Sequence, residues 1–174
     1  MATHGDVSGG WSGEYLQHGR SSPISAELEQ EGEQLSGSMR DGAPDRETSL
    51  FQAAAEAGLP PGTDERLTAR IREMYPELSD QPITAVSHLP PTSRLEGWVR
   101  GDRVYFLKTY EGTSSAGFKV GDRLMVSEQP AHSVHYQGRL SPDGREIDGR
   151  WWIDAKPELG HPRLEGLFTL RRPG

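Results

Sequence analysis

The residue types best suited to binding chemistry gather on two segments that the sequence pattern predicts to be neighbouring strands, 103–110 and 132–140. The set consists of Phe106, Lys108 and Tyr110 on the first segment, and His132 and Tyr136 on the second. Alternate side chains of a strand share a face, so these side chains are expected on one wall of a sheet. They would form a cationic, hydrogen-bonding patch in apolar surroundings, which is what specific recognition of a small ligand requires.

The segment His132-Ser-Val-His135 has the spacing H-x-x-H, which suits a metal ion when it lies on a helix. On a strand this spacing sends the two imidazoles to opposite faces, so one ion cannot bind both. No Asp, Glu or Cys stands at chelating spacing beside them, and we expect no metal site. A single histidine can still ligate haem, with His88 and His161 as further candidates, so the cofactor stays unknown.

The sequence offers little support for nucleophilic catalysis. It contains no cysteine and no Gly-x-Ser-x-Gly elbow. Asp143, Asp148 and Asp154 flank a predicted hairpin, and we expect them to form turns and solvated faces rather than an acid–base pair. We therefore assign no catalytic residue. An enzyme that uses the patch around Lys108 for acid–base work ranks last among the alternatives.

A five-residue pattern with apolar ends and a central glycine recurs along the chain. Its six copies begin at Trp11, Leu35, Leu95, Tyr136, Ile147 and Leu164. The apolar residues and the glycine are two positions apart, so on a strand they all face one side. Glycine weakens a flat strand, so six copies in the same phase indicate bends where a sheet curls into a barrel, or close approach of another backbone.

Eight strands follow from this pattern and from the turn residues between its copies. They cover about 10–17, 22–31, 34–40, 93–100, 103–110, 132–140, 145–154 and 163–171, and a short ninth at 82–88 is an open option. Ser141-Pro142-Asp143-Gly144 is a strong hairpin turn, because Pro presets one dihedral angle and Gly supplies a positive φ. Strands in hairpin succession favour an antiparallel up-and-down barrel whose closure removes exposed edges.

The periodicity becomes helical between the third and fourth of these strands. Thr48–Ala57 is predicted to be a helix that Gly58 ends. A second helix begins near Thr63, which can cap it, and ends before Pro76. The predicted organisation is a disordered N-terminus (1–8) and a single β-barrel domain (9–172). The domain contains this two-helix insertion (43–80) and a long loop (112–131).

Composition narrows the classes of partner. A chain of 174 residues suits one domain with a real core. The net charge of −7, with neither half strongly basic, argues against nucleic acid as a partner. The sequence has no apolar stretch long enough to span a bilayer, so we expect no membrane partner. The missing cysteines and leader peptide predict a cytoplasmic protein.

The opening Gly-Gly-Trp-Ser-Gly-Glu-Tyr, the succession of hairpins and the closing segment 166–170 resemble the calycin group, which comprises lipocalin, fatty-acid-binding and avidin-like barrels. Such barrels place Gly-x-Trp near the start of the first strand, whereas Gly10 is adjacent to Trp11 here. The opening is also similar to that of nitrobindin-type haem barrels. The resemblance implies a barrel that holds one small apolar ligand and whose tryptophan closes the bottom. The inserted helices do not stand where fatty-acid-binding barrels carry theirs.

We therefore expect a binding protein that holds a small, mostly apolar ligand in the barrel interior. The expected lining is aromatic, with two polar anchors: Trp11, Tyr15, Phe106, Tyr110, Tyr136 and Trp151, with Lys108 and His132. The alternative is a protein–protein interaction or assembly module, a homo-oligomer included, with a filled barrel. Such a module would act through its outer face and helical insertion, by way of Leu67, Ile71 and Trp152.

Overall fold

The computed structural model describes residues 5–42, 45–130 and 132–174. The chain divides into two compact units. The first, called the barrel unit, contains residues up to 43, 90–112 and 131–174; the second, called the sheet unit, contains 44–89 and 113–130. The sheet unit is therefore inserted into the barrel sequence at two places.

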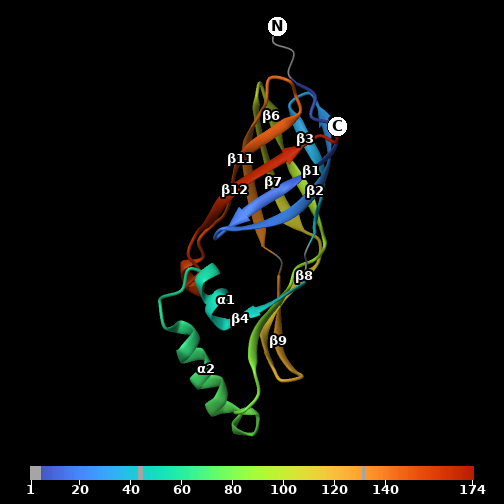
Figure 1. Cartoon of the computed structure of the whole chain (residues 1–174). Coiled ribbons are helices and arrows are strands. Elements are labelled where there is room, and N and C mark those ends of the chain that lie inside the picture. The colour runs from blue at the N-terminus through green and yellow to red at the C-terminus, as the bar shows by residue number, and fades with distance from the viewer. Residues whose placement is uncertain (1–4, 43–44, 131) are drawn as a thin grey trace. The chain divides into compact units, whose positions relative to one another are not determined.

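Eight antiparallel strands close the barrel in the order β1-β12-β11-β10-β7-β6-β3-β2 (Figure 1). Their bounds are β1 Gly9–Gln17, β2 Arg20–Glu31, β3 Gln34–Asp41, β6 Thr92–Arg100, β7 Arg103–Tyr110, β10 Ser133–Leu140, β11 Glu146–Ile153 and β12 Leu164–Arg171. The antiparallel barrel expected from the sequence is confirmed, and each predicted strand ends within two residues of an observed one.

The glycines of the five-residue pattern mark places where neighbouring backbones come too close for a side chain. A Cβ added at Gly13 would lie 1.8 Å from the carbonyl oxygen of Thr169, and one added at Gly97 would lie 1.8 Å from that of Tyr105. The remaining four also have a carbonyl oxygen of another strand within 2.7 Å of the added Cβ: Gly37, Gly138, Gly149 and Gly166. The pattern therefore records close backbone approach in the wall of a tightly coiled barrel.

One end of the barrel is closed by the segment before β1. Val7 is fully buried, its N–H donates to Gln30 Oε1 at 3.0 Å, and its carbonyl accepts from Trp11 Nε1 at 2.8 Å. Residues 5–8, expected to be disordered, are thus held by the barrel, because Val7 supplies an apolar plug and a backbone partner for the indole. Residues 1–4 of that expectation lie outside the described residues.

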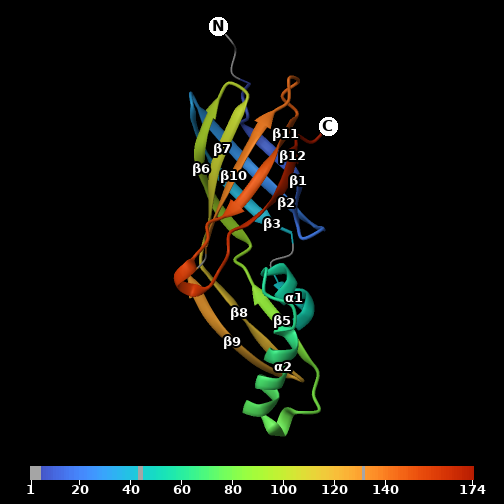
Figure 2. The same cartoon turned by 90° about the vertical axis from the view of Figure 1, so that its left-hand side faces the viewer.

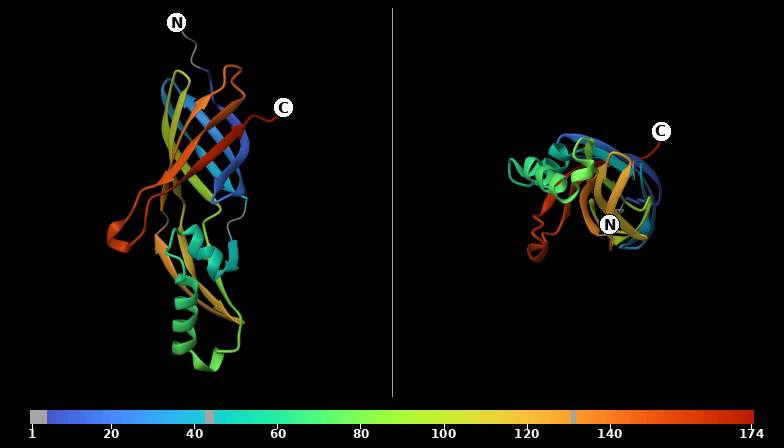
Figure 3. Two further views of the ribbon diagram at one scale, coloured as in Figure 1. Left: turned by 60° about the vertical axis from the view of Figure 1, so that its left-hand side comes forward. Right: turned by 90° about the horizontal axis from the view of Figure 1, so that it is seen from below.

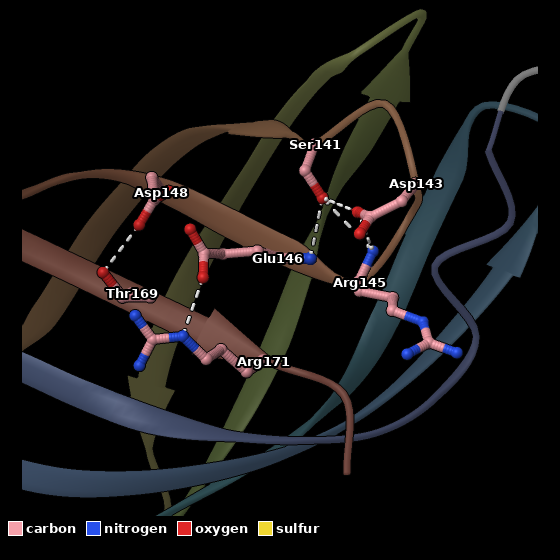
Figure 4. Close-up of polar contacts among 7 residues, drawn as sticks. All are labelled: Ser141, Asp143, Arg145, Glu146, Asp148, Thr169 and Arg171. Atoms are coloured by element: carbon pink, nitrogen blue, oxygen red, sulfur yellow. Dashed lines mark hydrogen bonds and ion pairs between the residues drawn. The ribbon is translucent and has the colours of Figure 1, made fainter. Parts of the chain in front are cut away.

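At the same closed end, a tight turn joins β10 to β11 (Figure 4). Ser141 Oγ accepts from the backbone N–H groups of Arg145 and Glu146, at 3.2 and 2.9 Å, and donates to Asp143 Oδ1 at 2.6 Å. Gly144 has φ of 71°, the left-handed conformation that the sequence predicted for it. At the other end, the link from β11 to β12 carries a short 3-10 helix, η2 (Pro157–Leu159), and projects beyond the strands (Figure 3).

The sheet unit is a four-stranded antiparallel sheet in the order β4-β5-β8-β9, accompanied by two helices (Figure 2). Its elements are β4 Asp45–Ser49, α1 Leu50–Glu56, α2 Thr63–Met74, η1 Pro76–Leu78, β5 Ile83–His88, β8 Thr113–Val120 and β9 Arg123–Pro130. The helices lie between β4 and β5, since a short strand that the sequence did not predict precedes them. The expected loop 112–131 instead holds the hairpin β8–β9, and the optional strand at 82–88 is present.

Capping explains where the helices begin and end. Ser49 Oγ accepts from the N–H of Gln52 at 3.1 Å, so α1 starts after Ser49 rather than at Thr48. Gly58 adopts φ of 69° just beyond α1, as predicted. Thr63 does not cap α2, because its hydroxyl donates to the carbonyl of Pro60 at 2.6 Å.

Among the described residues, no helix has both the length and the apolar character to cross a membrane.

Candidate functional site

Inward-facing polar side chains gather at the end of the barrel where β1, β3 and β7 end and β6 and β10 begin. We call this set the polar cluster: Tyr15, Asp41, Ser93, Lys108, Tyr110, His132 and Tyr136. Strand register brings its members together, because Ser93 on β6 pairs with Tyr110 on β7, and Lys108 pairs with Val134 on β10. Six of the seven lie on five strands, and His132 immediately precedes β10.

An ion pair stands at the centre of the polar cluster. Lys108 Nζ donates to Asp41 Oδ1 at 2.6 Å, and the two side chains are only 1% and 4% exposed. The same ammonium group donates to the Tyr110 hydroxyl at 3.2 Å. Burial lowers the pKa of Lys108, and the neighbouring carboxylate of Asp41 opposes this effect. A charge buried this deeply requires such a partner, because its isolated desolvation is very costly.

Tyr110, Tyr136 and His132 are held in their neutral forms. Burial, followed by the charge of Asp41, raises the pKa values of Tyr110 and Tyr136 well above the ordinary value of 10.0. Burial and then the charge of Lys108 lower the pKa of His132 below 6.5. The His132 ring packs edge-on against that of Tyr110, with centroids 5.2 Å apart. At neutral pH the site thus combines one balanced ion pair with phenols and a neutral imidazole.

Two buried oxygen atoms in the polar cluster have no hydrogen-bond partner among the described residues: Asp41 Oδ2 and Ser93 Oγ. Their side chains belong to residues only 8% and 0% exposed. Buried polar atoms of this kind are rare in native proteins and are often explained by a water, an ion or a functional role. The sequence interpretation missed both residues. Only their positions could have revealed them. Asp41 stands two residues after Met39 and Ser93 two residues before Leu95, so each side chain faces the same side of its strand as that inward-facing residue.

The middle of the barrel is filled by aromatic rings. Phe106 stacks on Tyr136 with centroids 5.0 Å apart, and Phe168 packs against both. Trp151 lies edge-on to Tyr15 at 6.0 Å, and its Nε1 donates to the carbonyl of Leu16 at 3.0 Å. Apolar packing therefore forms the inner boundary of the polar cluster.

The expected lining residues all lie on the inner side of the barrel, but they do not form one site. Lys108, Tyr110 and His132 meet in the polar cluster, with Tyr15 and Tyr136 close enough for charge interactions. Phe106 and Trp151 bound the cluster with apolar surface. Trp11 belongs to the opposite, closed end, where its indole binds Val7 and lies under the guanidinium of Arg172.

His135 points to the outer face of the barrel, as its strand position predicted. Its Nδ1 lies 2.8 Å from the Tyr105 hydroxyl and its Nε2 lies 2.9 Å from Asp154 Oδ2. Its ring stacks on Trp152 with centroids 4.8 Å apart, so Trp152 is exterior and partly covered by its neighbours.

Within the described part of the chain, no three His, Cys, Asp or Glu side chains are grouped as metal ligands.

The remaining acidic residues near the β10–β11 hairpin make local contacts on the outer face (Figure 4). Asp148 Oδ1 accepts from the Thr169 hydroxyl at 2.6 Å, and Glu146 pairs with Arg171 at 2.7 Å. These contacts join β11 to β12. A shallow groove of about 660 Å³ lies over the same strands, between Arg103 and Arg150, and is separate from the polar cluster.

The geometry therefore presents one concentrated polar site inside a closed antiparallel barrel, a fold compatible with the calycin-like type. Comparison with known proteins adds no further assignment. No protein-family model, curated protein or solved structure matches the chain.

Proposed function

We propose that the barrel is a calycin-like binding protein that takes up one small, mostly apolar molecule, whose polar group enters the polar cluster. The observation that carries this proposal is the buried ion pair between Lys108 and Asp41. The ligand body would lie against the ring of Tyr15, which belongs to the cluster, and that of Trp151, which borders it. No member of the cluster is assigned a catalytic role.

The energetics of buried charges support a functional role for this pair. Well-packed apolar residues of similar volume are often as stabilising as a buried ion pair, or more so. The closed end of the same barrel is built in that way, with Val7, Leu28, Val99 and Leu170 nearly inaccessible to solvent. Stability alone therefore does not explain why the other end holds charges and hydroxyls. A few convergent polar groups beside apolar surface are typical of a ligand site.

The test is native mass spectrometry of the purified protein, together with an absorbance scan from about 250 to 700 nm that detects haem-like cofactors. The proposal predicts a bound mass that dissociates on denaturation. It predicts loss of that mass in the double variant Asp41→Leu/Lys108→Met, which removes the ion pair without leaving an unpaired buried charge, and its retention in Arg139→Met, which removes an exposed cation on the outer face. Equal loss or equal retention in both variants would count against binding at the polar cluster.

An assembly module is the second candidate, favoured by exposed apolar side chains of the sheet unit. Phe51 is 70% exposed and Leu124 is 61% exposed. Ile71, one of the residues expected to serve such a surface, is 3% exposed and belongs to the core of its unit. Light scattering at increasing protein concentration tests this candidate. Self-association that Phe51→Ser abolishes would support it, and a monomer throughout would count against a homo-oligomer.

A further inference from the structure

The two unpartnered oxygen atoms point to the chemistry of the ligand's polar group. We propose that this group is a neutral hydrogen-bond donor, a hydroxyl or a primary amide, which binds Asp41 Oδ2 and Ser93 Oγ. The inference rests on the proposed function and names the class of ligand for the same site.

Strand register places these two oxygen atoms in one neighbourhood. Met39 on β3 pairs with Ser93 on β6, and the N–H of Asp41 donates to the carbonyl of Pro91 at 3.2 Å. Asp41 and Ser93 are therefore diagonal neighbours on the inner face of two adjacent strands. Diagonal Cα atoms lie about 7–8 Å apart, a span that one small polar group between the side chains can bridge.

The nature of the acceptor restricts what can bind there. An ionised carboxylate oxygen only accepts hydrogen bonds, so Asp41 Oδ2 requires an N–H or O–H group from its partner. A serine hydroxyl both donates and accepts. A primary amide or an alcohol can satisfy both oxygen atoms at once. Without a ligand, the two buried oxygen atoms would lose their hydration and gain no hydrogen bond in return, which lowers the free energy of unfolding.

The charges of the polar cluster exclude an ionic group. Lys108 and Asp41 already neutralise each other, with Nζ 2.6 Å from Oδ1. A ligand ammonium group at Oδ2 would add a second positive charge beside Lys108, and a ligand carboxylate would face the carboxylate of Asp41. Either would leave an unbalanced charge in a region of low dielectric constant. A neutral donor satisfies Oδ2 without changing the net charge.

Four probes with the same ten-carbon chain test this chemistry by isothermal titration calorimetry on the full-length protein at pH 7. They are 1-decanol, decanamide, decylamine and decanoate, which present neutral, neutral, cationic and anionic groups. We expect decanol and decanamide to bind at least about tenfold more tightly than the two ions. In Ser93→Ala, decanamide should lose about tenfold in affinity, whereas Ser38→Ala, at an exposed position of β3, should leave binding unchanged.

The outcomes separate the inference from the function on which it rests. Equal or tighter binding of decylamine or decanoate would overturn the neutral-donor inference and leave the barrel a ligand-binding protein. Undiminished decanamide binding in Ser93→Ala would also overturn it. If none of the four probes binds, the proposed function fails together with the inference, and ordered water becomes the explanation for the two oxygen atoms.

Discussion

Lys108 and Asp41 meet inside the barrel as an ion pair that solvent does not reach, with Nζ 2.6 Å from Oδ1. The two residues come from strands β7 and β3, which are separated in the barrel wall by β6. Their side chains therefore converge in the interior rather than along one strand pair. Burial is the main cause of the pKa shifts in the polar cluster, and the pair adds to it: Asp41 further raises the pKa values of Tyr110 and Tyr136, and Lys108 further lowers that of His132.

Removing one member of this pair should be far more damaging than removing both. Lys108→Met leaves the Asp41 carboxylate buried without a counter-ion, and we expect a loss of about 3–5 kcal/mol in the free energy of unfolding. The double variant Asp41→Leu/Lys108→Met should be as stable as the wild type, or more stable by up to about 4 kcal/mol. Urea denaturation followed by tryptophan fluorescence measures both, because all four tryptophans lie in the barrel unit.

Arg171→Ala is the control for these two variants. It breaks the exposed pair with Glu146 on the outer face (Figure 4), and we expect no measurable change in the same experiment. A double variant as unstable as Lys108→Met would mean that the pair itself stabilises the barrel. The argument that it is kept for function would then fail.

The barrel should become less stable as the pH decreases below 6.5, and His132 is one cause. The pKa of this residue is lowered in the folded state, chiefly by burial, so between that lower value and 6.5 the unfolded chain binds more protons. The free energy of unfolding therefore increases as the pH rises through this window, and it decreases as the pH falls through it. His132→Gln should flatten the profile there. His161→Gln, at an exposed position, should follow the wild type, and parallel wild-type and His132→Gln profiles would contradict the assignment.

The close approach of strands at the pattern glycines predicts a large difference between two neighbouring substitutions on β1. Gly13→Ala would place a Cβ 1.8 Å from the backbone oxygen of Thr169, and we expect a destabilisation of about 3 kcal/mol. Gly10→Ala meets only the end of the Glu27 side chain, at 3.0 Å, which can move aside. Thermal unfolding should separate the two variants clearly. Similar melting temperatures would show that the barrel wall relaxes around a side chain.

The barrel strands could be predicted from sequence because their information is local. Alternation, the phase of the glycines and turns such as Ser141–Gly144 each act within a few residues of the chain. The hairpin β8–β9 was missed because Ser114, Ser115 and Gly117 resemble loop composition. The strand β4 was missed because its five residues, Asp45–Ser49, are mostly polar and carry no apolar alternation.

The candidate site was only half predictable for a different reason. Lys108, Tyr110 and His132 stood out by residue type, and their common strand pair brought them into one set. Asp41 lies 67 residues from Lys108 in the chain, beyond the inserted sheet unit, so no local pattern links them. Ser93 is an ordinary serine by type, and only the barrel register reveals that it is buried and opposite Tyr110.

Ligand binding at the polar cluster is tested most directly by NMR of the protein with ¹³C-labelled tyrosine rings, titrated with decanamide. The chain has five tyrosines, of which Tyr15, Tyr110 and Tyr136 belong to the polar cluster. Tyr75 lies in the sheet unit and Tyr105 lies on the outer face of the barrel, so both serve as internal controls. We predict shifts confined to the three resonances of the cluster. Shifts only at Tyr75 or Tyr105, or at none of the five, would contradict the account.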